Sequence, residues 1–133
     1  MTMIHADVQA WLDRYVEAWK TYEPATVESL FSEDAEYLYH PWDEPVRGRA
    51  AIVADWLSPG GDEAGRDRPG TWSARYEPYV VEGNRAVVIG ESTYFSDATQ
   101  ATVDRRYWNN WLLEFDDAGR CRRFVEYYMQ RKA

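Results

Sequence analysis

Apolar residues near the start of the chain recur every three to four positions, which is the spacing of one helix face. The pattern predicts a helix over residues 6–22, carried by Val8, Trp11, Leu12, Tyr15, Val16 and Trp19. Pro24 suits the first turn of a second, short helix that continues to Phe31. The same spacing returns at residues 49–57, where we expect a third helix that ends before Pro59.

The second half of the chain is rich in β-branched and aromatic residues, which favour strands. Four segments fit this description: 72–81, 85–95, 106–115 and 120–130. Turn signals separate neighbouring segments at residues 83–84 and 116–119. A further strand is expected over residues 35–40, because Pro41 disfavours a helical backbone at His40.

Helices that precede a run of long antiparallel strands are typical of an α+β domain. Strands of this length twist strongly, and the helices must cover the concave side of the sheet. The glycine-rich residues 60–70 and the polar residues 96–104 are expected to be loops. The sequence therefore predicts an α+β domain in which three N-terminal helices pack against a strongly curved antiparallel sheet, giving a cone with an opening.

The length of 133 residues matches one domain over residues 1–133. A formal charge of -8 disfavours binding to nucleic acid and to anionic membrane surfaces. No apolar run approaches the roughly 20 residues of a membrane span, and residues 1–13 lack the pattern of a secretory signal. Cys121 is the only cysteine, so no internal disulfide can form. Together these features predict a cytoplasmic protein.

Two stretches of the chain share a frame with a known superfamily. The first, RYVEAWKTYEPATVESLFSEDAEYLYHPWDEPVRGRAAI, combines a helix, the words LF and DA within residues 30–35, an extended segment before a proline, and Arg47-Gly48 before a third helix. The second is LLEFDDAGRCRRFVEYYM, with a D-x-x-G-R turn between two strands. Both resemble the NTF2-like superfamily, in particular its ketosteroid isomerase and SnoaL-like members. The resemblance covers nearly the whole chain and implies a cone-shaped α+β roll, but this fold carries many activities.

The resemblance also implies positions for three functional residues. The isomerases of the superfamily use a tyrosine on their first helix to hydrogen-bond a developing enolate, and this position matches Tyr15. Their general base is an aspartate directly before a proline, which corresponds to His40 if one inserted residue is allowed. Their second oxyanion donor is a protonated aspartate, and counting back from the Gly119 turn places Trp111 there. A histidine can still transfer protons, but Trp111 removes an acid donor and departs from the steroid isomerase pattern.

Side chains alternate between the two faces of a strand, so one inward residue fixes the facing of its neighbours. With Trp111 inward, the pocket would also be lined by Tyr107, Asn109, Leu113 and, across the hairpin, Phe124, Glu126 and Tyr128. The opposite face would carry Trp108, Leu112, Val125, Tyr127 and Met129. A large apolar outer face indicates burial against a partner, so we expect a homodimer through this face. The facing of residues 85–95 stays open, because both faces of that segment are mixed.

His40 and Glu126 are the candidate proton-transfer groups. His40 would act as a general base or acid on a bound carbon acid or alcohol, or it is a hydrogen-bonded histidine at a strand end. A carboxylate among aromatic residues should have a raised pKa or a partner, so Glu126 is either catalytic or ligand-orienting, or it pairs with Arg122 or Arg75. Asp43 could orient the His40 imidazole, although a solvated carboxylate in a turn is the more common case.

The other candidates would hold the ligand, which we expect to be a small hydrophobic molecule. Tyr15 and Asn109 could donate hydrogen bonds to a ligand carbonyl; otherwise they are a core aromatic residue and a satisfied buried amide. The aromatic candidates for the wall of the pocket are Trp42, Tyr107, Trp111, Phe124 and Tyr128.

Several kinds of chemistry lack a signal in this sequence. Two scattered histidines and one cysteine give no metal-ligand cluster, and no glycine motif for a dinucleotide or phosphate is present. Cys121 is expected to face outward, and no serine lies on a G-x-S-x-G turn, so nucleophilic catalysis is disfavoured. Two function classes remain. One is a cofactor-independent enzyme of SnoaL-like type, catalysing isomerisation, dehydration or cyclisation; the other is a non-catalytic domain that binds a hydrophobic ligand or a protein partner.

Overall fold

The computed structural model describes residues 2–58 and 66–131. The helices are α1 (His5–Thr21), α2 (Pro24–Leu30) and α3 (Arg49–Leu57). The strands are β1 (Phe31–Leu38), β2 (Val46–Arg47), β3 (Trp72–Glu82), β4 (Arg85–Phe95), β5 (Val103–Phe115) and β6 (Cys121–Arg131). Among the residues described, no helix is both long and apolar enough to cross a membrane.

The predicted helices and the four long strands are confirmed to within a few residues. Phe31 differs from the prediction: it is the first residue of β1, whereas the sequence pattern placed it at the end of the second helix. The two-residue strand β2 was not predicted, since so short a segment carries no alternation. Most of the predicted loop 60–70 lies outside the described residues, which resume at Arg66.

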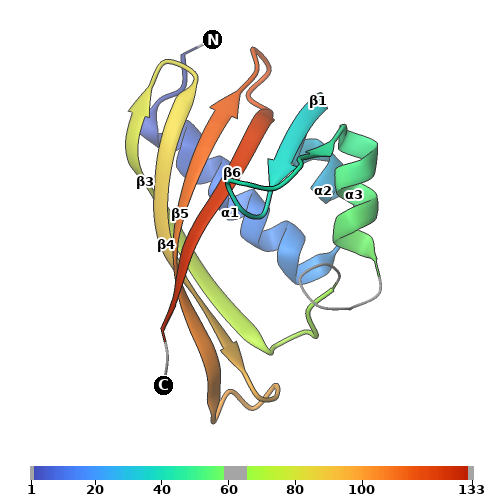
Figure 1. Cartoon of the computed structure of the whole chain (residues 1–133), viewed down its shortest axis with the longest axis vertical. Helices are drawn as coiled ribbons and strands as arrows, with labels where there is room; N and C mark the ends of the chain where they lie inside the picture. The colour runs from blue at the N-terminus through green and yellow to red at the C-terminus, as the bar shows by residue number, and fades with distance from the viewer. Residues whose placement is uncertain (1, 59–65, 132–133) are drawn as a thin grey trace.

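The six strands form one curved sheet in the order β2-β1-β6-β5-β4-β3 (Figure 1). Neighbouring strands are antiparallel except for β1 and β6, which run parallel. Helix α1 crosses the concave side of the sheet, and α2 and α3 lie beside β1 (Figure 1). The α+β fold is therefore confirmed, with a mixed sheet, because the last strand inserts between β5 and the first strand.

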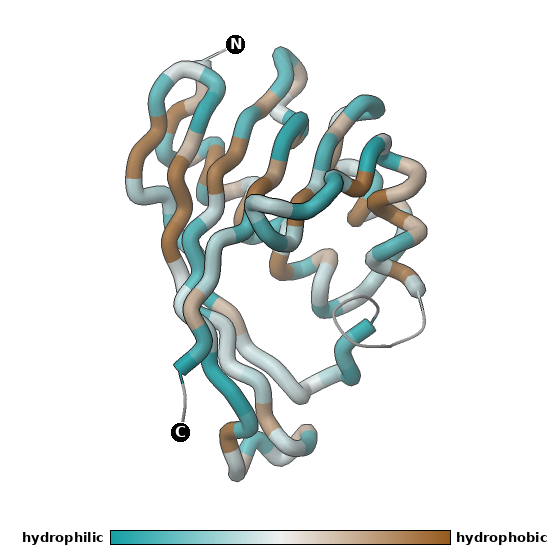
Figure 2. Tube along the Cα trace, viewed as in Figure 1, coloured by the Kyte–Doolittle hydropathy of each residue, from teal (hydrophilic) through white to brown (hydrophobic). Residues whose placement is uncertain are grey.

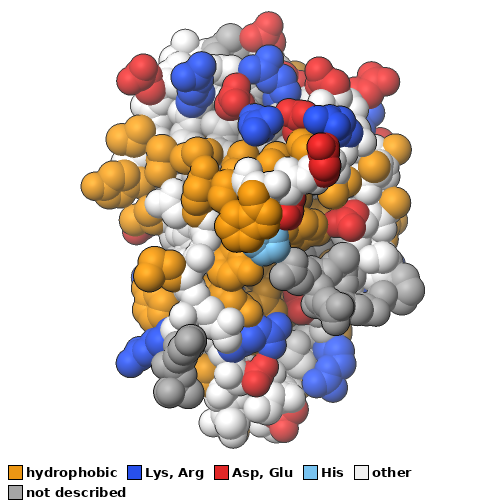
Figure 3. Space-filling view, viewed as in Figure 1, with side chains coloured by type: hydrophobic (Ala, Val, Ile, Leu, Met, Phe, Trp, Pro, Cys, Tyr) orange, Lys and Arg blue, Asp and Glu red, His pale blue; other side chains and the backbone are white. Residues whose placement is uncertain are grey.

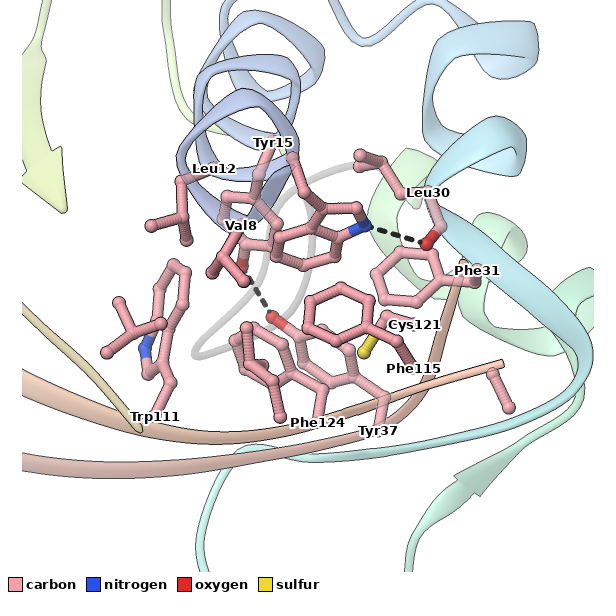
Figure 4. Close-up of a cluster of buried hydrophobic side chains, with 14 of the residues drawn as sticks. Val8, Leu12, Tyr15, Leu30, Phe31, Tyr37, Trp111, Phe115, Cys121 and Phe124 are labelled. Carbon is pink, nitrogen blue, oxygen red and sulfur yellow. Dashed lines mark hydrogen bonds between the residues drawn. The ribbon is translucent and has the colours of Figure 1, made fainter. Parts of the chain in front are cut away.

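The core lies between α1 and the inner face of the sheet. Trp11 and Leu12 of α1 are almost completely buried, and in Figure 4 this side of the helix faces Phe115 and Phe124 of the sheet. The Nε1 of Trp11 donates a hydrogen bond to the carbonyl oxygen of Leu30 (3.0 Å), so its polar edge is satisfied inside the core. Figure 2 shows hydrophobic positions concentrated in the upper half of the molecule, and the lower parts of the long strands are paler.

The predicted alternation along β5 and β6 is confirmed by the strand register. Trp111 lies opposite Glu126 and Leu113 lies opposite Phe124, so all four side chains share the inner face. Of the predicted outer residues, Trp108, Leu112, Tyr127 and Met129 are exposed, whereas Val125 is buried beside Leu38 of β1. Hydrophobic side chains form a band across the middle of the face shown in Figure 3, with charged side chains above and below it.

The structure also fixes the facing of β4, which the sequence left open. Ala86, Val88 and Ser92 are buried on the inner face. Gly90 has the same parity, and a Cβ at this position would lie 2.3 Å from the carbonyl oxygen of Arg75 and 2.3 Å from the ring of Tyr76. Only glycine therefore allows the Tyr76 ring to pack against β4.

The prediction that Cys121 faces outward is wrong. The register shifts between Glu114, which pairs with Arg123, and Phe115, which pairs with Cys121. This irregularity adds one residue to β6, so the residues of β6 before it face the opposite side from the one that alternation predicts. The Cys121 side chain therefore points into the core and is completely buried. Burial raises the pKa of the thiol far above its ordinary value, which leaves the residue inert.

Candidate functional site

A cavity of about 270 Å³ lies between the concave face of the sheet and the helices α1 and α3. Eleven of its eighteen lining residues are Tyr or Trp. Such rings are apolar with a polar edge, so this wall suits a flat ligand with few polar groups. We call Ser92, Asn109, Trp111 and Glu126 the floor of the cavity, and Trp19, Tyr22, Asp67, Tyr94 and Arg105 its mouth.

A chain of hydrogen bonds on three neighbouring strands holds the carboxyl group on the floor. The Oγ of Ser92 donates to Oδ1 of Asn109 (2.9 Å), which leaves the Nδ2 of Asn109 to donate to Oε1 of Glu126 (3.1 Å). In contrast, Oε2 of Glu126 and Nε1 of Trp111 are buried without a hydrogen-bond partner among the described residues. Neither atom is exposed to the cavity, and the indole N–H lies close enough to act on the Glu126 carboxyl, so a ligand would reach this carboxyl after a small rotation of the side chain.

The carboxyl group of Glu126 is held in its neutral form. Burial raises the pKa of Glu126 to about 8, and the polar groups of Trp111 and Asn109 lower it by less. The indole N–H is close enough to favour the carboxylate, but its position does not meet the geometry of a hydrogen bond. The alternative ion pair with Arg122 does not form, because Arg122 pairs with Glu114 (3.1 Å). At pH 7 Glu126 is therefore mostly a hydrogen-bond donor.

Tyr15 of α1 and Tyr37 of β1 meet through their hydroxyl groups. The two oxygen atoms are 2.7 Å apart, and both rings stack in parallel on Phe124, with centroids at 5.6 Å and 4.3 Å (Figure 4). Burial raises the pKa of both tyrosines, so both stay protonated. One hydroxyl donates to the other, and the accepting hydroxyl keeps its own proton for a further acceptor.

His40 lies on the cavity wall just after β1, within a set of polar contacts. Its Nδ1 is 2.9 Å from Oδ2 of Asp43, and its Nε2 is 3.1 Å from the hydroxyl of Tyr128. A carboxylate can only accept, so we assign the Nδ1 proton to the bond with Asp43, and Nε2 then accepts from Tyr128. Asp43 thus orients the imidazole, which is the less common of its two predicted roles.

The mouth of the cavity combines aromatic rings with charged groups. Trp19 Nε1 donates to Oδ2 of Asp67 (2.8 Å), and the Asp67 amide donates to the hydroxyl of Tyr22 (2.9 Å). Tyr22 ends α1 with a left-handed backbone (φ 52°), which is uncommon for a residue other than glycine. The guanidinium of Arg105 lies over the ring of Tyr94, at 4.1 Å from its centroid.

The structure brings most of the predicted site residues to one cavity. Those that line it are Tyr15, His40, Tyr107, Asn109, Trp111, Glu126 and Tyr128. The prediction is wrong for Trp42, which is 79% exposed and stacks on the outside of His40. It is also wrong for Phe124, which is completely buried because the rings of Tyr15 and Tyr37 lie against it.

Sequence reasoning missed several lining residues, among them Tyr76, Ser92, Tyr94, Asp67 and Arg105. Those on β3 and β4 could have been found only if the facing of β4 had been known. Arg105 precedes the expected start of its strand, and Asp67 lies in the expected loop. Within the ranges 2–58 and 66–131, no group of three or more His, Cys, Asp or Glu side chains is arranged to hold a metal ion.

No curated protein sequence matches this chain. Among solved structures, it is similar to a candidate ketosteroid isomerase from Kribbella flavida DSM 17836 (18% identity; 97% of this chain and 82% of that chain covered; TM-score 0.67). It is also similar to an LEH-like epoxide hydrolase of M. tuberculosis (14% identity; 94% and 84% covered; TM-score 0.58) and to a protein from Sphaerobacter thermophilus (19% identity; 92% and 94% covered; TM-score 0.60). At these identities the similarity shows the NTF2-like fold alone. The SnoaL-like domain matches residues 12–124, and the chain therefore belongs to the SnoaL-like domain family.

Proposed function

We propose that this protein carries out cofactor-independent acid–base chemistry on a small, mainly apolar ring compound that bears a carbonyl or hydroxyl oxygen. The observation that carries the proposal is the buried carboxyl of Glu126 in the wall of an aromatic cavity, which among the described residues is held only by the hydrogen bond from Asn109 to its Oε1. Once a bound ligand turns this carboxyl and the neighbouring indole N–H toward the cavity, both groups can donate to one ligand oxygen. Two such donors would stabilise negative charge that develops on that oxygen during a reaction.

The proposed mechanism divides the proton transfer between two residues. Glu126 and Trp111 hold the ligand oxygen, while His40, oriented by Asp43, accepts a proton from a carbon next to it. Tyr128 must release Nε2 of His40 for this step. Isomerisation, dehydration and cyclisation can all begin with removal of such a proton. The similar structures described as an isomerase and an epoxide hydrolase support small-molecule chemistry in a cavity of this kind.

A second candidate function is non-catalytic binding of a hydrophobic ligand or a protein partner. It is favoured by two hydrogen bonds between polar groups of the wall, Tyr15 with Tyr37 and Tyr128 with His40. Groups that bond to one another do not need a polar ligand atom as their partner. A site of this kind would hold a ring compound by apolar contact without turnover.

Deuterium exchange separates the two candidates. 2-Tetralone, a flat ketone with exchangeable protons next to its carbonyl, is incubated in D₂O with the protein and followed by NMR. The enzyme proposal expects protein-dependent exchange that falls at least about 100-fold in Glu126→Leu, which is the usual cost of removing one donor to a developing oxyanion, whereas glutamine would keep an N–H donor there. Glu114→Leu is the matched control, because Glu114 lies outside the cavity and pairs with Arg122. Binding of 2-tetralone without exchange would support the second candidate, and exchange that persists in Glu126→Leu would contradict the role of this residue.

A further inference from the structure

An open groove of about 490 Å³ adjoins the mouth of the cavity. It is bounded by residues 66–68, Thr71, 94–96 and 104–105, so it lies where the loop before β3 approaches the end of β4 and the start of β5. Arg66, Asp67, Tyr94 and Arg105 line both the groove and the cavity. A ligand that fills the cavity can therefore extend into the groove past these side chains.

Arg105 stands at the junction with its guanidinium fixed in place. Its Nε donates to the hydroxyl of Tyr107 (3.0 Å), its Nη1 donates to Oδ2 of Asp104 (2.6 Å), and its plane lies over the ring of Tyr94. Nη2 has no hydrogen-bond partner in the part of the chain that the structure describes. A guanidinium held on two edges and one face loses little further freedom when it binds a ligand oxygen at the remaining edge.

Charged side chains line this groove on a chain that is acidic as a whole. Arg66, Arg68 and Arg105 lie against Asp67 and Asp104, and Asp97, next to the lining residue Ser96, interacts with Arg68. Asp67 also accepts a hydrogen bond from Trp19, which reduces its capacity to neutralise an arginine. The position for an anion is therefore the remaining edge of Arg105 and not a general positive field.

We infer that the ligand carries a carboxylate at the end opposite its reacting oxygen, and that this carboxylate lies in the groove against Arg105. The inference rests on the proposed function, because it takes the floor around Glu126 as the place of the reacting oxygen. A carboxylate held outside at Arg105 would also fix the direction in which the ring enters, with its other end on the floor. The ligand class is then a flat ring acid with a carbonyl or hydroxyl group at its far end.

Calorimetric titration with two probes tests this inference at neutral pH. 6-Hydroxy-2-naphthoate has a hydroxyl and a carboxylate at opposite ends of one ring system, and 2-naphthol lacks the carboxylate. The wild-type protein should bind the naphthoate about 5- to 10-fold more tightly, which is the range of a partly exposed charged pair. Arg105→Gln should reduce this ratio to about one, and Arg105→Lys, which keeps the charge but not the planar fork, should give an intermediate ratio.

Arg85→Gln is the matched control, because it removes the same charge from an exposed site at the other end of β4, roughly 30 Å from the groove. It should leave the preference for the naphthoate unchanged. The inference is overturned by equal affinity for the two probes, by a preference that survives Arg105→Gln, or by failure of both probes to bind. Glu126→Leu, which removes the donor, reports on the proposed function separately, since it should weaken the binding of 2-naphthol, which has no group for Arg105. A protein that passes the Glu126 test and fails the Arg105 test keeps its function and loses only the carboxylate site.

Discussion

Replacing Glu126 with glutamine keeps the size of the side chain and removes its titration. In the folded protein, burial raises the pKa of Glu126 from its ordinary 4.5 to about 8. The unfolded chain exposes the same carboxyl to water, where it ionises near its ordinary value. Between these two values the folded protein holds a proton that the unfolded chain has released. The stability that Glu126 contributes is therefore complete at low pH and is lost as the pH rises toward 8.

The size of the effect follows from the two pKa values. One pKa unit corresponds to about 1.4 kcal/mol, so the full effect between pH 4.5 and 8 is about 5 kcal/mol. Water that enters the cavity on ionisation would reduce this figure, which makes it an upper value. Small domains are stable by only about 5–15 kcal/mol in total, so even half of the effect is easily measured.

Urea unfolding of wild type and Glu126→Gln at intervals from pH 5 to pH 9 is the assay. We expect the difference between the two free energies of unfolding, variant minus wild type, to increase from pH 5 to about pH 8. Above pH 8 this difference should stay constant. Other titrating groups cancel in the difference, and Glu114→Gln controls for the loss of one negative charge. A difference between wild type and Glu126→Gln that stays constant within about 0.5 kcal/mol would show that Glu126 is an ordinary solvated carboxylate.

Three further predictions concern packing and assembly. Gly90→Ala should lower the free energy of unfolding by about 1–3 kcal/mol, because its Cβ would clash with the carbonyl oxygen of Arg75; a neutral effect in urea unfolding would mean that the strands separate freely here. Tyr15→Phe should cost about 1–2 kcal/mol by the same measurement, because it leaves the buried hydroxyl of Tyr37 without its partner, and unchanged stability would refute that pairing. We also propose that the protein forms a homodimer through the outer face of the sheet. Sedimentation should show a dimer at micromolar concentration and a monomer for Leu112→Asp, and a wild-type monomer would disprove the dimer.

Local patterns in the sequence were sufficient for the elements and for part of the site. Residues 49–57 form the predicted helix because their apolar spacing and the following Pro59 act within a few residues of one another. Glu126 lies opposite Trp111 because the hairpin fixes the register of its two strands. Alternation along each strand then places both side chains on the same face. That Glu126, Asn109 and Trp111 share one face therefore needed no knowledge of the remaining fold, whereas the choice of this face as the inner one rested on the resemblance to the NTF2-like isomerases.

Contacts between distant segments decided the rest. Cys121 turned inward because a local irregularity added a residue to β6, which alternation counted along the chain does not register. His40 meets Tyr128, 88 residues later, because β1 runs parallel to β6, and Ser92 reaches Glu126 through Asn109 only across three strands. The sequence by itself determined which side chains share a strand face, since that depends on neighbours two residues apart. The closing of the sheet around α1 determined which faces meet, and with it the cavity, the neutral carboxyl and the arginine at the mouth.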